Sequence, residues 1–112
     1  MSEPIEQNQR RNHAALCAQV RKIEEELRRL GYLTGPIGPA QTVNSAFGIG
    51  EMPFEAWLTK VFLPRSYESV ASGDWPTSSH IGIAAIRNFD GLSKCDPLVD
   101  LLCDLDRMIN AE

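Results

Sequence analysis

The sequence predicts an all-α protein, a four-helix bundle or a compact helical array, with the second helix kinked or broken at Pro64. Apolar residues recur at spacings of three and four in several segments, which is the period of a helix. No segment shows the alternating pattern of a half-buried strand. With 112 residues, 43% of them apolar and 23% charged, the chain has the composition of one globular domain.

The first predicted helix extends from Asn12 to Gly31. Its apolar stripe consists of Leu16, Val20, Ile23, Leu27 and Leu30. Asn12 is suited to cap free amide groups at the start, and Gly31 is suited to the left-handed conformation that ends a helix. Two ion pairs are expected on the outer face, Glu24 with Arg28 and Glu25 with Arg29. Residues 1–11 are predicted to form a flexible tail, and residues 12–112 a single domain.

A long connection follows between Tyr32 and Gly50, where several glycines and prolines interrupt any regular period. It also contains apolar residues, namely Leu33, Ile37, Val43, Phe47 and Ile49. We therefore expect a loop that lies across the core and not a linker between domains.

The second helix is predicted to begin at Pro53, where a missing amide hydrogen is tolerated. One face carries Phe54, Trp57, Leu58, Val61 and Phe62. Pro64 cannot donate to the carbonyl of Lys60, so the helix must end or kink there. Beyond it the apolar residues move to another face, made of Leu63, Tyr67 and Val70. The second part of this helix is expected to end near Gly73.

Two further helices complete the prediction. The shorter one lies between Ser79 and Phe89, where the isoleucines have poor helical phase. In the last helix Asp96 is expected as the cap and Pro97 in the first position. Its apolar face carries Leu98, Leu101, Leu102, Leu105, Met108 and Ile109.

Charge and composition exclude several classes of protein. The net charge of -4 argues against a protein that binds nucleic acid by neutralising phosphates. The polar start of the chain lacks the apolar core of a signal peptide, and no apolar run is long enough to cross a bilayer, so a cytoplasmic protein is expected. Three widely spaced cysteines without a CxxC motif predict reduced thiols.

Arg65 and Trp57 are the first candidate interaction residues. A guanidinium held next to a proline can bind carboxylates or phosphates, and a tryptophan can anchor an interface. The structural alternative makes Arg65 an internal clamp that pairs with Glu68 or caps freed carbonyls, and makes Trp57 part of the core. From the sequence alone we prefer this structural interpretation over a role in binding.

Asp100 and Asp104 are the second candidates, on a row with Asp96 along the last helix. Such a row is usually a solvated face, and the functional alternative is a docking surface for a basic partner.

No catalytic, cofactor or metal site is predicted. His13 and Cys17 are one helical turn apart and could face one metal ion, but two ligands do not make a site. Cys103 lies near Asp100 and Asp104, whose negative charge disfavours a reactive thiolate. The glycines from Gly48 to Gly50 lack a phosphate-loop pattern, and a tight turn explains them.

The segment MPFEAWLTKVFLPR resembles the signature of the YqcC-like family of small bacterial helical proteins. The matching residues are Trp57, Leu58, Val61, Phe62, Leu63, Pro64 and Arg65. The Asp-Pro-Leu segment and the following leucine-rich helix, with Leu105 and Asp106 near its end, also resemble the family. Thr59 and Ser66 depart from it, because Gln and Met are common there.

The resemblance implies an all-helical fold and an association, through gene neighbourhood and naming, with tRNA pseudouridine synthase C. It carries over no catalytic residue, because the chain resembles the companion of that enzyme and not the synthase.

Two functions follow as hypotheses. The first is a non-catalytic accessory or protein-interaction module, with an RNA-modifying enzyme as the partner. The second is a small-molecule-binding bundle with a pocket near the kinked helix.

Overall fold

The computed structural model describes residues 3–111, with side chains for residues 12–111, and every regular element in this range is helical. The α-helices are α1 (Glu3–Arg29), α2 (Phe54–Trp57), α3 (Leu63–Ser72), α4 (Ile81–Asn88) and α5 (Asp96–Asn110). A π-helical segment, Leu58–Phe62, joins α2 to α3, so these pieces form one continuous helix and the predicted four helices are confirmed. None of the described helices has the length and apolar character required to cross a membrane.

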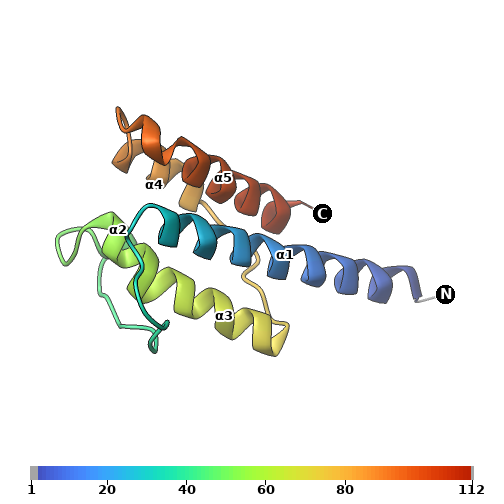
Figure 1. The fold of residues 1–112 in the computed structure, drawn as a ribbon. Coiled ribbons are helices and arrows are strands. Elements are labelled where there is room, and N and C mark those ends of the chain that lie inside the picture. The colour runs from blue at the N-terminus through green and yellow to red at the C-terminus, as the bar shows by residue number, and fades with distance from the viewer. Residues whose placement is uncertain (1–2, 112) are drawn as a thin grey trace.

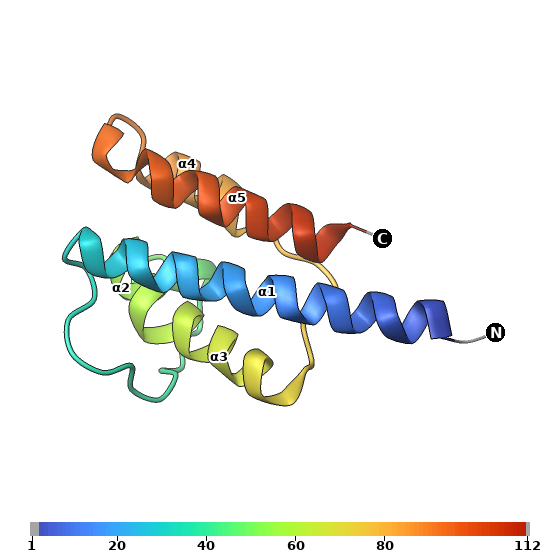
Figure 2. The ribbon, with the colours of Figure 1, turned by 45° about the vertical axis from the view of Figure 1, so that its right-hand side comes forward.

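The helices form three layers with α1 in the middle. The α4–α5 pair lies on one side of α1, and the helix that contains α2 and α3 lies on the other (Figure 1). The turned view in Figure 2 shows the same order. The buried side of α1 supplies Leu16, Val20, Ile23 and Leu27 to the core, as the stripe predicts. Gln19 is also buried, and its amide donates to the carbonyl of Leu101 at 2.9 Å, which joins α1 to α5.

The start of α1 differs from the prediction. The helix begins at Glu3, so residues 3–11 of the expected tail have helical backbone and Asn12 is an interior position. Pro4 lies in the first turn, where it is tolerated, and good helix formers follow without a glycine. Residues 1–2 lie outside the described range. At the other end Gly31 has φ of +83°, which is the predicted left-handed conformation.

The predicted kink at Pro64 takes the form of a π turn. The amide of Leu63 donates to the carbonyl of Leu58, five residues back, so one extra residue is inserted before the proline. Pro64 has no amide hydrogen to donate to the carbonyl of Lys60. This carbonyl accepts a hydrogen bond from the backbone amide of Gln41 instead, at 2.9 Å. The loop before α2 therefore replaces the bond that the proline removes.

The extra residue explains why the buried face changes along this helix. Leu58 and Leu63 are both fully buried although they are five positions apart, a spacing that would separate them on a regular helix. Beyond the π turn Tyr67 and Val70 pack against the core, whereas Arg65 is exposed. The predicted change of the buried face along this helix is confirmed.

The α4–α5 pair is held by a close helix crossing at Gly82. A Cβ atom built on Gly82 would lie 2.8 Å from the Sγ of Cys103 and 2.9 Å from Oδ2 of Asp106. Only glycine permits this approach, which explains the glycine in a short helix. The predicted cap of α5 is wrong: Asp96 is the first helical residue and makes no capping bond.

The connection from Tyr32 to Gly50 lies partly against the core, as predicted. Leu33 is buried, and Ile37 and Phe47 pack on the buried cluster, but Ile49 is 71% exposed. Ile49 is exposed because it lies at the tip of a tight turn between two glycines with positive φ.

Candidate functional site

A pocket of about 600 Å³ opens between α3, the connection 73–80 and α5. We call it the Trp57 pocket. It is lined by Phe47, Trp57, Phe62, Arg65, Ser66, Glu68, Ser69, Ser72, Asp74, Trp75, Pro76, Ser78, Ser79, His80, Ile81, Leu105 and Ile109. The volume lies within the range of about 300–1,000 Å³ that is typical of ligand sites. Both Trp57 and Arg65 therefore border one cavity.

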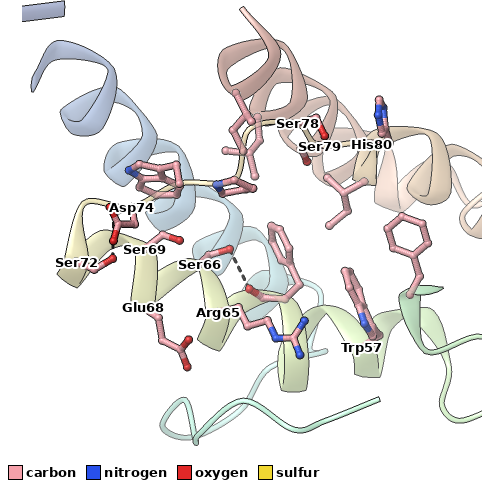
Figure 3. A pocket seen from close by; sticks show the side chains of 17 residues that line it. Trp57, Arg65, Ser66, Glu68, Ser69, Ser72, Asp74, Ser78, Ser79 and His80 are labelled. Carbon is pink, nitrogen blue, oxygen red and sulfur yellow. Dashed lines mark hydrogen bonds between the residues drawn. The ribbon is translucent and has the colours of Figure 1, made fainter. Parts of the chain in front are cut away.

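The Trp57 pocket is elongated, with polar rims along both sides (Figure 3). One rim is the face of α3 that carries Ser66, Ser69 and Ser72, and the other is the segment from Ser78 to His80. Trp57 lies at one end and Asp74 at the other. Apolar side chains complete the lining, namely Phe62, Ile81, Leu105 and Ile109. The pocket thus combines an apolar surface with polar edges.

An aromatic cluster positions the Trp57 end. The ring centroid of Trp57 lies 5.2 Å from Phe47, 5.8 Å from Phe54 and 5.9 Å from Phe62. Such pairs add to the stability that burial supplies. Trp57 is half-buried, so it is part of this cluster and also presents surface to the pocket.

The turn that carries Phe47 is built for close contact with Trp57. Phe47 has φ of +54°, a left-handed conformation that is unusual for an aromatic residue. The next residue, Gly48, has φ of +68°, and a Cβ atom there would lie 3.0 Å from Cδ1 of Trp57. The carboxylate of Glu51 closes the turn by accepting hydrogen bonds from the Ser45 hydroxyl and from the amides of Asn44 and Ser45. The bond from the hydroxyl, followed by the two from the amides, lowers the pKa of Glu51.

Arg65 does not form the expected internal clamp. It is exposed, and among the described residues it makes neither an ion pair with Glu68 nor a hydrogen bond to a carbonyl. The carbonyl freed by the proline is occupied by Gln41 instead. The guanidinium is therefore available at the edge of the pocket, towards the Trp57 end (Figure 3).

The connection 73–80 is anchored near its start by Trp75. The indole N–H of Trp75 donates to Nδ1 of His13 at 3.0 Å, and the two rings are 5.9 Å apart. The Sγ of Cys17 lies 3.5 Å from Nε2 of the same histidine. His13 and Cys17 are thus close, as the sequence suggests, but no group of three metal-binding side chains occurs among the described residues. In this arrangement His13 holds a wall of the pocket.

The other end of the connection is anchored by α5. The carboxylate of Asp106 accepts from the hydroxyl of Ser79 at 2.6 Å and from the amides of Ile81 and Gly82 at 3.1 and 2.7 Å. Asn110 makes two further bonds with the backbone of Ser79, both at 2.8 Å. Asp106 is therefore the cap of α4, supplied by another helix.

Ser79, His80 and Asp106 include the residue types of a catalytic triad but not its geometry. A triad requires the histidine between serine and aspartate. Here the Ser79 hydroxyl donates directly to Asp106, and His80 makes no hydrogen bond to any described residue. The arrangement fixes the start of α4 and does not activate the serine.

The second candidate pair lies elsewhere. Asp100 is exposed, and Asp104 forms an ion pair with Arg107 on the same helix. Neither aspartate lines the Trp57 pocket. Cys103, between them in sequence, has a raised pKa because it is partly buried and because the charge of Asp106 lies nearby, with a smaller contribution from Asp100. The predicted low reactivity of this thiol follows, with burial as the main cause.

Several pocket residues were not predicted from the sequence. Ser66, Ser69 and Ser72 recur every three residues, which indicates one helical face, but small polar residues give no chemical signal alone. Trp75 lies in a glycine- and proline-containing connection, where no periodicity shows which way its side chain points. Asp106 follows the acidic row in the sequence without a partner that spacing could show, and only the packing of α4 on α5 reveals its role as a cap.

The model of the family DUF446, described as tRNA pseudouridine synthase C, matches residues 15–108. The chain belongs to this family. The range that matches DUF446 includes α2 to α4, α5 as far as Met108, and all residues of the Trp57 pocket except Ile109. No curated protein and no solved structure matches the chain.

Proposed function

We propose that the chain is a non-catalytic accessory module that binds a partner protein at the Trp57 pocket. The observation that carries this proposal is the exposed Arg65, which has no described partner and lies at the edge of an open apolar pocket beside Trp57. Tryptophan and arginine are the residues most enriched among those that dominate binding energy at interfaces. A charge without an internal role next to an apolar surface is suited to an external ligand.

The polar chemistry around the pocket supports a role without catalysis. The contact between the hydroxyl of Ser79 at its rim and the carboxylate of Asp106 caps a helix, and the thiol of Cys103 in α5 has a raised pKa. The family description supports an RNA-modifying enzyme as the partner class. The net charge of -4 and the carboxylates at the rim favour a protein partner over direct contact with nucleic acid, and a cytoplasmic location fits such a partner.

The acidic row is proposed as a secondary contact. Asp100 is exposed without a described partner, whereas the charge of Asp104 is partly used by Arg107. A basic surface on the partner would therefore meet Asp100 first. Contributions from such exposed charges are small and depend on salt.

The proposal is tested by affinity purification of the tagged chain from its native host at modest salt. A Ser69→Tyr variant fills the pocket, and Ser93→Tyr is a matched control on the exposed turn between α4 and α5. We expect a stoichiometric partner with the wild type and with Ser93→Tyr, and its loss with Ser69→Tyr. Recovery of the same partner with both variants would refute the role of the pocket, and clean preparations without a partner would refute the accessory role.

The second candidate is a small-molecule site, which the pocket volume of about 600 Å³ favours. Native mass spectrometry of the freshly purified protein separates the two. A bound molecule that is present in the wild type and in Ser93→Tyr, and absent in Ser69→Tyr, would support this function over the accessory role.

A further inference from the structure

The Trp57 pocket has opposite charges at its two ends. Arg65 lies towards Trp57, and Asp74 lies at the far end, with Glu68 between them on the same rim (Figure 3). All three side chains are exposed and make no ion pair with any described residue. A ligand that lies along the pocket therefore meets a cation at one end and the carboxylate of Asp74 at the other.

The length of the pocket suits a short peptide. The helix axis rises about 10 Å between Arg65 and Ser72, and Asp74 follows after Gly73. An extended chain advances about 3.3 Å per residue, so about four residues span this distance.

The apolar lining and the serine rim fit the middle of such a segment. Phe62, Ile81 and Leu105 offer a surface for aliphatic or aromatic side chains. The hydroxyl of Ser69 makes no bond to any described residue, and Ser78 is exposed, so each rim carries a hydroxyl that can meet a peptide backbone. Ser66 is already bonded to the carbonyl of Phe62 at 2.9 Å and is not needed for this.

The geometry points to a ligand of defined chemistry: we propose that the Trp57 pocket binds a partner segment of about four to six residues with an acidic residue at the Trp57 end, apolar residues in the middle and a basic residue at the Asp74 end. This inference rests on the proposed function, since it specifies what the partner presents. The acid forms a charge-assisted bond with Arg65, and the base meets Asp74. A phosphate backbone is disfavoured, because two carboxylates face it for one guanidinium.

The test uses the full chain and random peptides of about eight residues displayed on phage. We expect the enriched peptides to carry an acidic and a basic residue separated by apolar positions. Synthetic copies, measured by fluorescence anisotropy, should bind Arg65→Glu on the order of tenfold more weakly or worse, because like charges then meet. A peptide with its acid replaced by lysine should regain binding to Arg65→Glu.

Two controls make the result decisive. Lys60→Glu makes the same change of charge on the same helix outside the pocket, and should alter binding by less than about threefold. Circular dichroism establishes that Arg65→Glu is folded, and Arg65→Gln removes the charge without reversing it. Absence of enrichment, enriched peptides without an acid, or equal binding to Arg65→Glu would each overturn the inference.

The outcome is separable from that of the proposed function. If Ser69→Tyr loses the native partner but the peptides fail, the pocket binds a partner through other chemistry. If Ser69→Tyr keeps the partner, the pocket itself is not the site.

Discussion

The α4–α5 junction and the Trp57 pocket are neighbours, joined by the connection 73–80, yet they use their polar groups in opposite ways. At the junction the carboxylate of Asp106 accepts three hydrogen bonds and Gly82 permits van der Waals contact between the helices. At the pocket the charges of Arg65, Glu68 and Asp74 are exposed and unpaired within the described chain. The polar residues at the junction thus stabilise the fold, whereas those at the pocket are free to bind a partner.

The largest expected effect comes from closing the gap at Gly82. Gly82→Leu places a side chain where a Cβ atom already meets Cys103 and Asp106 within 3.0 Å, so the two helices must separate. We expect a loss of about 3 kcal/mol or more in the free energy of unfolding, measured by urea denaturation. Gly38→Ala is the control, since no atom lies within 4 Å and its φ is not positive. A Gly82→Leu protein as stable as this control would contradict the close crossing.

Removal of the cap is the next effect in size. Asp106→Ala leaves the Ser79 hydroxyl and the amides of Ile81 and Gly82 without their acceptor. We expect a loss of about 2 kcal/mol in the free energy of unfolding, because caps and charge-assisted bonds are worth this amount. Asp100→Ala, an exposed aspartate on the same helix, should change stability by less than about 0.5 kcal/mol. Equal losses for the two variants would show that Asp106 is also a surface charge.

A smaller effect is expected at the contact of α1 with α3, and it depends on pH. The Tyr67 hydroxyl donates a hydrogen bond to the carboxylate of Glu24. Burial of the Tyr67 side chain, together with this bond, raises the pKa of Tyr67 to about 12. Burial alone would raise the pKa of Glu24, but the bonds from Tyr67 and Arg28 outweigh it and lower the pKa below 4.5. The stability that Glu24 contributes is therefore fully present above pH 4.5, and it is lost as the pH falls through the lowered pKa of Glu24.

Tyr67→Phe tests this contact. It should cost about 1 kcal/mol at neutral pH, and the cost should shrink as the pH falls through the lowered pKa of Glu24, because the carboxyl group is then protonated in both proteins. Chemical denaturation at a series of pH values measures the difference. A cost that stays constant over this range would mean that the bond does not depend on the charge of Glu24.

The smallest expected effect is at Arg65. Because its guanidinium has no described partner, Arg65→Ala should change the free energy of unfolding by less than about 0.5 kcal/mol. Thermal denaturation beside Lys60→Ala, another exposed cation on this helix, measures it. A loss above 1 kcal/mol would restore the internal clamp and weaken the case for Arg65 as a binding residue.

Periodicity was sufficient for the helices but not for the site. The stripes of α1 and α5 and the change of face at Pro64 follow from the spacing of apolar residues, which reports what a helix buries. The sequence does not show the hydrogen-bond partners of Asp106, because they lie at the start of another helix. It does offer Glu68 to Arg65, but no ion pair between them forms among the described residues. Arg65 was therefore expected to be clamped, and the structure leaves it exposed, whereas the role of Asp106 as a cap follows only from the packing of α4 on α5.

The start of α1 and the contents of the pocket could not be predicted for related reasons. Polar residues after Pro4 lack an apolar stripe, yet they are good helix formers and continue a helix that packing stabilises farther along. The serines of α3 and Trp75 become a pocket only when α5 and the connection 73–80 are placed beside them.

The hydrogen bond from the Gln41 amide to the Lys60 carbonyl has a consequence for how the protein opens. Because the turn before Pro64 takes this bond from a remote loop, the Gln41 amide can exchange its proton only when the loop separates from the turn. In a hydrogen-exchange experiment Gln41 would stand out as a slow amide among fast neighbours. Any event that frees the loop would leave the carbonyl of Lys60 without this hydrogen bond. Motion of the loop would therefore affect the helical turn that precedes Arg65.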